Sequence, residues 1–126
     1  MKFLMLMIPR VYQPGTPAAE RAGADFMPPA EALDKMGKFN EALAKAATMI
    51  DIDGLRPPAE GARITFEGGS PKVTEGPASG AKDLIGGYWI FEIGSKEEAL
   101  EWARRVPAEA GDVIELRPIF DLSEEA

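Results

Sequence analysis

Residues 75–89, EGPASGAKDLIGGYW, decide how this chain is interpreted, because they join a turn, a charged connector and a double glycine to an apolar segment. Gly76-Pro77 predicts a turn, since glycine adopts unusual φ angles and proline fixes its own. Gly86 to Ile93 has the apolar and aromatic content of a strand. Alternation puts two large side chains on each face of that strand, Trp89 and Phe91 on one and Tyr88 and Ile90 on the other. Both faces should therefore be covered.

Working outward from this stretch, the preceding residues predict a strand, a loop, a helix, a second strand and a hairpin. A continuous apolar run of strand length comes first, and one face of the helix carries a stripe at helical spacing. A Gly-Gly pair fits the hairpin turn. The predicted ranges are 3–8 for the first strand, 10–28 for the loop, 29–48 for the helix, 49–55 for the second strand, and 62–66 with 71–74 for the hairpin. The stripe consists of Leu33, Met36, Asn40, Leu43 and Ala47.

After the opening stretch, Ser95 and Glu98 form a capping box, in which each side chain satisfies a backbone amide at a helix start. A helix is expected over 96–105, followed by a last strand over 113–118. With the hairpin set aside, the order is β-α-β-β-α-β, which predicts an α+β, ferredoxin-like fold with an inserted hairpin. Two helices cover one face of such a sheet. A second copy of the chain is the simplest cover for the other face.

Composition restricts the possible functions. The chain has 126 residues, which predicts a single domain over 1–126 with an acidic tail at 121–126. It has no cysteine and no histidine, which excludes thiolate metal sites, cysteine nucleophiles and histidine-based triads; we expect no metal and no cofactor. The net charge of −7 disfavours nucleic acid. No segment reaches transmembrane length, so we expect a cytoplasmic protein that does not engage a membrane.

The order and spacing within residues 75–89 resemble the signature of the YCII-related family, in its DGPF branch. The matching positions are Gly76, Pro77, Lys82, Gly87 and Tyr88. The similarity extends to Met36-Gly37, Gly54-Leu55, the 97–103 segment and the 115–118 segment. The chain departs from the signature at Glu75, Ala78 and Gly80. The resemblance implies a dimeric α+β barrel, in which two ferredoxin-like sheets face each other. It also implies a histidine–aspartate catalytic pair in the better-known branch, which this histidine-free chain cannot form.

Six residues are candidates for a ligand site, each with a structural alternative. Asn40 lies on the sheet-facing stripe, so its amide either bonds the sheet backbone or lines a cleft between helix and sheet. Glu75 sits in a turn or at a pocket rim. Lys82 is a solvated loop lysine or holds an anionic ligand. Tyr88 and Trp89 belong to the core or subunit interface, or to a site. Arg10 is an exposed loop residue or part of a lid with Tyr12 and Asp25.

Three functions remain open from the sequence. The first is a small dimeric domain that binds a small molecule in a helix–sheet cleft, without evident catalytic machinery. The second is a cofactor-independent enzyme of the dimeric α+β barrel type, which rests on fold analogy. The third is a regulatory partner protein linked to a sigma factor. Whether the protein is an enzyme is left open, and its self-association as a homodimer through the sheet face is expected.

Overall fold

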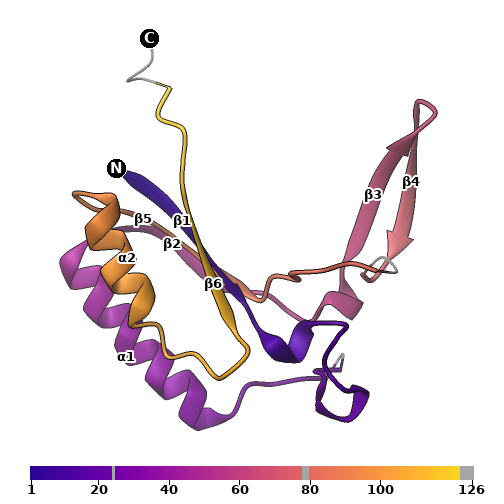
Figure 1. The fold of residues 1–126 in the computed structure, drawn as a ribbon, viewed down its shortest axis with the longest axis horizontal. Helices are drawn as coiled ribbons and strands as arrows, with labels where there is room; N and C mark the ends of the chain where they lie inside the picture. Colours follow the sequence, from indigo (N-terminus) through magenta and orange to yellow (C-terminus); the bar gives the residue numbers. More distant parts are fainter. Residues whose placement is uncertain (24, 78–79, 123–126) are drawn as a thin grey trace.

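A four-stranded antiparallel sheet forms the centre of the protein (Figure 1), in a computed structural model that describes residues 1–126 except 24, 78–79 and 123–126. The strand order is β2-β5-β1-β6. The strands are β1 (Lys2–Ile8), β2 (Thr48–Gly54), β5 (Gly87–Glu92) and β6 (Val113–Pro118). Two helices, α1 (Ala30–Ala46) and α2 (Lys96–Arg104), lie on one face of the sheet (Figure 1). The predicted α+β class is confirmed, and the strand order is that of a ferredoxin-like fold.

Local sequence explains where the helices begin. Pro29, the first residue of the predicted helix range, occupies the N-cap position of α1. Ser95 caps α2, with its hydroxyl oxygen accepting a 3.2 Å hydrogen bond from the backbone N–H of Glu98. The serine half of the predicted capping box is therefore present. The helix and strand boundaries lie within two residues of the predicted ones.

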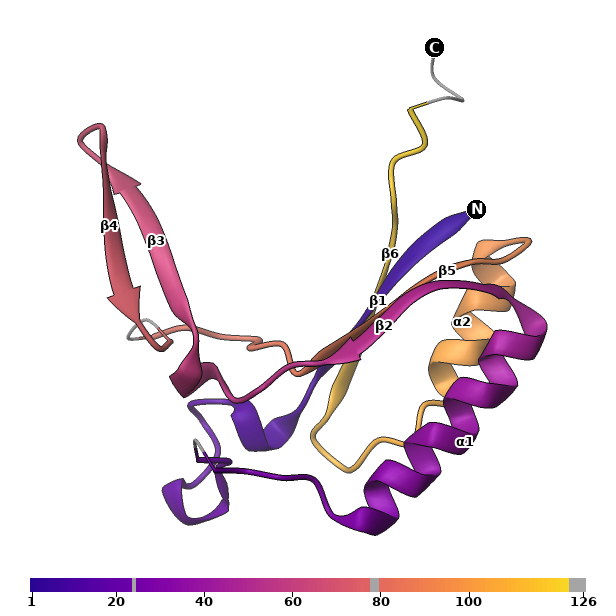
Figure 2. The same ribbon diagram turned by 180° about the vertical axis from the view of Figure 1, so that it is seen from behind.

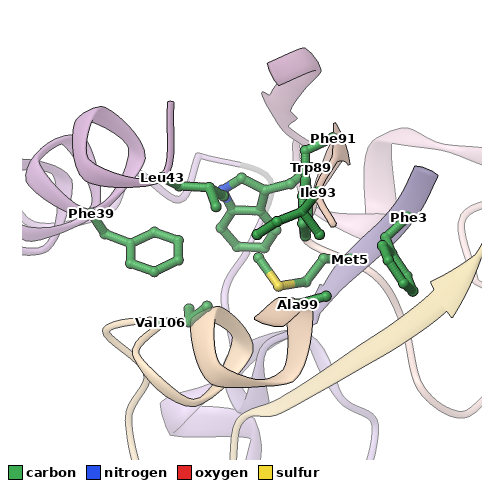
Figure 3. Packing of buried hydrophobic residues seen from close by; sticks show 9 residues of the cluster. All are labelled: Phe3, Met5, Phe39, Leu43, Trp89, Phe91, Ile93, Ala99 and Val106. Carbon is green, nitrogen blue, oxygen red and sulfur yellow. The ribbon is translucent and has the colours of Figure 1, made fainter. Parts of the chain in front are cut away.

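The core lies between the helices and the sheet (Figure 3). It is built from alternate residues of β1 and β5, from α1 and from the α2 region: Phe3, Met5, Phe39, Leu43, Trp89, Phe91, Ile93, Ala99 and Val106. The predicted alternation along β5 is confirmed. The helix stripe is partly wrong at its edges, because Phe39 is buried and Leu33 remains 53% exposed. Leu33 lies near the start of α1, where a cleft separates the helix from the sheet.

The opposite face of the sheet is apolar in its middle and carries no helix (Figures 1 and 2). We call it the open face. Register places four partly exposed residues in its centre, Leu4, Leu6, Tyr88 and Ile90, with Leu4 paired to Ile90 and Leu6 to Tyr88. Asp51 and Asp53 continue these rows on the β2 edge, and Arg117 and Glu115 continue them on the β6 edge. This pattern fits the sequence-based expectation of a second apolar face.

The hairpin formed by β3 (Ala62–Glu67) and β4 (Ser70–Glu75) projects from the sheet (Figures 1 and 2). Its turn uses Gly68 and Gly69 at φ +59° and +85°, which is the left-handed region that glycine tolerates. Gly76 follows at φ +70°, so the predicted turn after the hairpin is present.

The loop over 10–28 contains two short 3₁₀ turns, η1 (Arg10–Tyr12) and η2 (Ala18–Glu20). A third 3₁₀ turn, η3 (Pro58–Glu60), lies between β2 and the hairpin. Most of the predicted acidic tail, residues 123–126, lies outside the described part of the chain. Within that part, no helix is long and apolar enough to cross a membrane.

Candidate ligand cleft between helix α1 and the sheet

A cleft of about 470 Å³ opens between α1 and the β2–β5 side of the sheet. The helix, the sheet and two connecting segments all contribute to its wall. Most of the lining is apolar: Met7, Pro28, Ala32, Leu33, Met36, Ile52, Trp89 and Pro107. Asn40, Asp53, Tyr88 and four glycines complete the wall. The volume is within the range of small-molecule sites in proteins.

A buried side-chain hydrogen bond fixes the wall of the cleft. The Trp89 indole Nε1–H donates to Asn40 Oδ1 at 2.8 Å, and Trp89 is 3% exposed. Figure 3 shows the Trp89 ring reaching from β5 towards α1, where the Phe39 ring meets it edge-to-face with 6.1 Å between the ring centroids. Because the indole can only donate, the amide oxygen of Asn40 must face it. The Asn40 Nδ2 group has no hydrogen-bond partner among the described residues, and it remains available as a donor to a ligand.

Glycines set the space inside the cleft. Gly37 lies on the cleft side of α1, and a β-carbon there would meet nothing within 4 Å. Glycine inside a helix costs about 1 kcal/mol relative to alanine, so its presence leaves room rather than adding stability. On the sheet side, a β-carbon on Gly86 would lie 2.6 Å from Pro9 Cγ, so only glycine lets the chain pass there.

Charge is sparse along the cleft. None of its described lining residues is a lysine or arginine, and the one charged residue, Asp53, pairs with Tyr88 in the sheet and has its side chain on the open face. Tyr88 also borders the cleft, but its side chain belongs to the open face, where its hydroxyl donates to Asp51 Oδ2 at 2.9 Å. This hydrogen bond raises the pKa of Tyr88 above its ordinary value of 10.0, because it favours the neutral phenol beside a carboxylate.

Three of the six predicted site residues, Asn40, Tyr88 and Trp89, line the cleft, but only the Asn40 and Trp89 side chains come together there, because the Tyr88 side chain lies on the open face. The other three lie outside its lining. Lys82 is exposed in the connector before β5, and Glu75 is exposed at the end of β4. Asn40 binds an indole side chain rather than the sheet backbone, so the predicted backbone hydrogen bond is replaced by a side-chain one.

Arg10 has a structural role at the start of the long loop. Its guanidinium pairs with Glu20 at 3.0 Å, and its backbone N–H donates to Asp112 Oδ1 at 2.8 Å. Its side chain also packs against Gly111, where a β-carbon would lie 2.7 Å from Arg10 Cδ. Arg10 therefore ties the loop to the connection between α2 and β6.

Further hydrogen bonds fix the loop to the end of the sheet. The Tyr12 hydroxyl donates to the Leu55 carbonyl at 2.9 Å, and burial raises the pKa of Tyr12, with a contribution from Glu60. The Gln13 amide both donates to the Leu84 carbonyl and accepts from the Leu84 N–H, at 2.8 Å each. The loop supplies Pro28 to the cleft wall, which sequence periodicity does not predict.

A larger hollow of about 660 Å³ lies at the base of the hairpin. Most of its lining residues are exposed, so it is open to solvent rather than enclosed. Its Arg56 is already paired with Glu60, with 2.9 Å between Nε and Oε2. The cleft beside α1 has the better combination of enclosure, apolar surface and a free polar donor. Among the described residues, no group of three or more His, Cys, Asp or Glu side chains could hold a metal ion.

Comparison with protein families gives one match over nearly the whole chain. The family model of the YCII-related domain matches residues 1–123. The chain belongs to the YCII-related family. This family match does not distinguish the DGPF branch within the family. A separate comparison of this YCII-related chain with individual curated proteins finds no match.

Proposed function

We propose that this YCII-related protein, as a member of the DGPF branch, binds a small, neutral and largely apolar organic molecule in the cleft between α1 and the sheet. The observation that carries the proposal is the Asn40 amide. Its oxygen is held by the Trp89 indole, and its Nδ2 group is left as a donor in an otherwise apolar wall. A few placed polar groups within an apolar pocket are typical of small-molecule sites.

The charge of the lining selects between ligand classes. A carboxylate or phosphate in the cleft would lose hydration without gaining a cationic partner. A neutral aromatic ring with a carbonyl or hydroxyl acceptor fits better, because the ring contacts Met36 and Trp89 while the acceptor meets Asn40. The proposal concerns binding. The Tyr88 hydroxyl is engaged on the open face, which gives no specific support to acid–base catalysis within the cleft.

The test is a binding experiment with paired neutral and anionic ligands. Saturation-transfer NMR with indole and phenol should show binding, and the matched indole-3-carboxylate and benzoate should bind more weakly. Gly37→Leu should abolish binding by filling the cleft. Ala42→Leu adds the same side chain to an exposed position of α1 that does not line the cleft, so it should bind like the wild type. Equal binding by both variants would refute the cleft as the site.

We further propose that the protein is a homodimer through the open face. Leu4, Leu6, Tyr88 and Ile90 form an apolar centre that no helix covers. An uncovered apolar sheet face of this kind is typical of an interaction surface. In a symmetric dimer the same face of both subunits would pack together, as in sheet-on-sheet packing.

The charges at the two edges distinguish the possible orientations of the subunits. Asp51 and Arg117 lie at opposite edges of the sheet in one row of side chains. Asp51 pairs with Ile90, Ile90 with Leu4, and Leu4 with Arg117. A two-fold axis parallel to the strands would place β2 over the partner's β6, with each Asp51 opposite an Arg117 and each Asp53 opposite a Glu115. An axis perpendicular to the strands would instead place the acidic β2 edges against each other and bring the β6 edges, with Arg117 and Glu115, together. Each orientation therefore joins attractive and repulsive charges, and charge reversal distinguishes the two.

Charge reversal tests the orientation that places β2 over the partner's β6. Asp51→Arg or Arg117→Asp alone should weaken the dimer in sedimentation equilibrium, since each reversal creates two like-charge contacts in a symmetric dimer. The double variant should recover much of the lost affinity. Failure of the double variant to recover any affinity would contradict that orientation.

A further inference from the structure

The β3–β4 hairpin carries an apolar face that the described part of the chain leaves uncovered. Cross-strand register pairs Ile64 with Val73 and Phe66 with Pro71, so these four side chains share one face of the ribbon. Ile64, Phe66 and Val73 are 56%, 77% and 60% exposed. Every residue of β3 is exposed, and so is every residue of β4 except Thr74.

Such a hairpin needs a partner surface. A two-stranded hairpin on its own is marginally stable in water. The other face of this one carries polar and charged side chains, among them Arg63, Thr65 and Lys72. The division into an apolar and a polar face is the pattern of a ribbon that packs on one side against another surface.

The position of the hairpin indicates which surface that is. It rises from the end of the sheet on the side away from the helices, so the hairpin and the open face form the two arms of a V in both views (Figures 1 and 2). A molecule that packs on the open face therefore also lies beside the hairpin. We propose that the apolar face of the hairpin packs onto a second copy of this chain, as an arm that embraces the partner subunit. This inference rests on the homodimer proposed above.

The area of the interface supports a second copy as the occupant. Four strands of about six residues present a planar face of about 400 Å², or roughly 800 Å² for two subunits, at the usual strand spacing and rise. That value is typical of crystal contacts, whereas stable complexes bury about 1,200–2,000 Å². Each hairpin face adds about 200 Å², and an equal area of the partner, so two arms add roughly 800 Å². With the arms, the dimer reaches the size of a stable interface.

Matched charge insertions on the two faces of β3 test the inference. Phe66→Glu places a carboxylate on the apolar face, and Thr65→Glu places one on the polar face of the neighbouring position, opposite Lys72. Sedimentation equilibrium should show the dimer weakened at least about tenfold by Phe66→Glu and unchanged by Thr65→Glu. A second measurement uses the wild-type protein. Amide hydrogen exchange over 62–67 and 70–75 should slow as the protein concentration rises through the dimer Kd.

The outcomes separate this inference from the proposed dimer. One outcome is that both variants dimerise as tightly as the wild type and that amide exchange in the hairpin does not depend on protein concentration. That outcome would overturn the arm and leave the sheet-face dimer standing. Slow hairpin exchange in the monomer would also overturn it, because the arm would then pack on its own chain. A wild-type protein that stays monomeric at all concentrations would overturn the dimer and the arm together, and the hairpin face would remain for a different protein partner.

Discussion

The hydrogen bond between Asn40 and Trp89 makes a quantitative prediction about stability. Asn40→Leu preserves the approximate size of the side chain but leaves a buried indole N–H without an acceptor. The bond is 2.8 Å long and Trp89 is 3% exposed, so water reaches the orphaned N–H poorly. An unsatisfied buried donor costs about 1–3 kcal/mol, and the better helix propensity of leucine recovers a few tenths of a kcal/mol. We expect a net loss of about 1–2.5 kcal/mol in the free energy of unfolding.

Trp89→Phe provides the matched background, because it removes the donor itself. In that background Asn40→Leu no longer orphans a group, so it should cost close to nothing. The coupling energy from the double-mutant cycle should therefore be about 1–2 kcal/mol. Urea unfolding followed by far-UV circular dichroism, at one fixed protein concentration, measures each free energy. A coupling below about 0.5 kcal/mol would be within the error of additive sites and would refute the view that this hydrogen bond holds the cleft wall.

Three further predictions concern the glycines and the open face. Gly37→Ala should raise the free energy of unfolding by about 0.5–1 kcal/mol, because its new methyl group meets nothing within 4 Å; a loss of stability would show that the cleft side of α1 is packed. Gly86→Ala should lower it by about 1–3 kcal/mol, since the β-carbon would lie 2.6 Å from a proline ring carbon, and an unchanged midpoint in urea would contradict this close approach. In a Tyr12→Phe background, the absorbance titration of Tyr88 should have its midpoint above pH 10.0 and should shift down with Asp51→Ala. Because the folded pKa of Tyr88 is raised, its contribution to stability is complete below pH 10.0 and is lost as the pH rises through the folded pKa; a midpoint that Asp51→Ala does not move would contradict the hydrogen bond.

The elements of the fold follow from local patterns in the sequence. Alternation identified the two faces of β5, the Gly-Gly pair identified the hairpin turn, and Ser95 with Glu98 identified the start of α2. Periodicity was less reliable at the ends of α1. It placed Leu33 inside the core, although the helix diverges from the sheet there and leaves Leu33 exposed at the cleft.

The site could be predicted in part. A polar residue on an otherwise apolar stripe identified Asn40, and the double glycine before β5 drew attention to Tyr88 and Trp89. Pro28 and Pro107 carry no periodic signal, because they reach the cleft from irregular connections whose path depends on tertiary hydrogen bonds. Arg10 shows the opposite case. Its charge and loop position suggested a ligand contact, but its pairing with Glu20 depends on a turn that composition does not predict.

The indole N–H signal of Trp89 offers the most direct test of the ligand cleft. The chain has two tryptophans, and Trp102 does not line the cleft, so its indole signal is an internal control. In ¹H–¹⁵N spectra, titration with indole or phenol should shift the Trp89 signal and leave the Trp102 signal in place. The shift should disappear in Gly37→Leu. A Trp89 signal that stays unmoved at millimolar ligand, or that moves equally in Gly37→Leu, would contradict a binding site between α1 and the sheet.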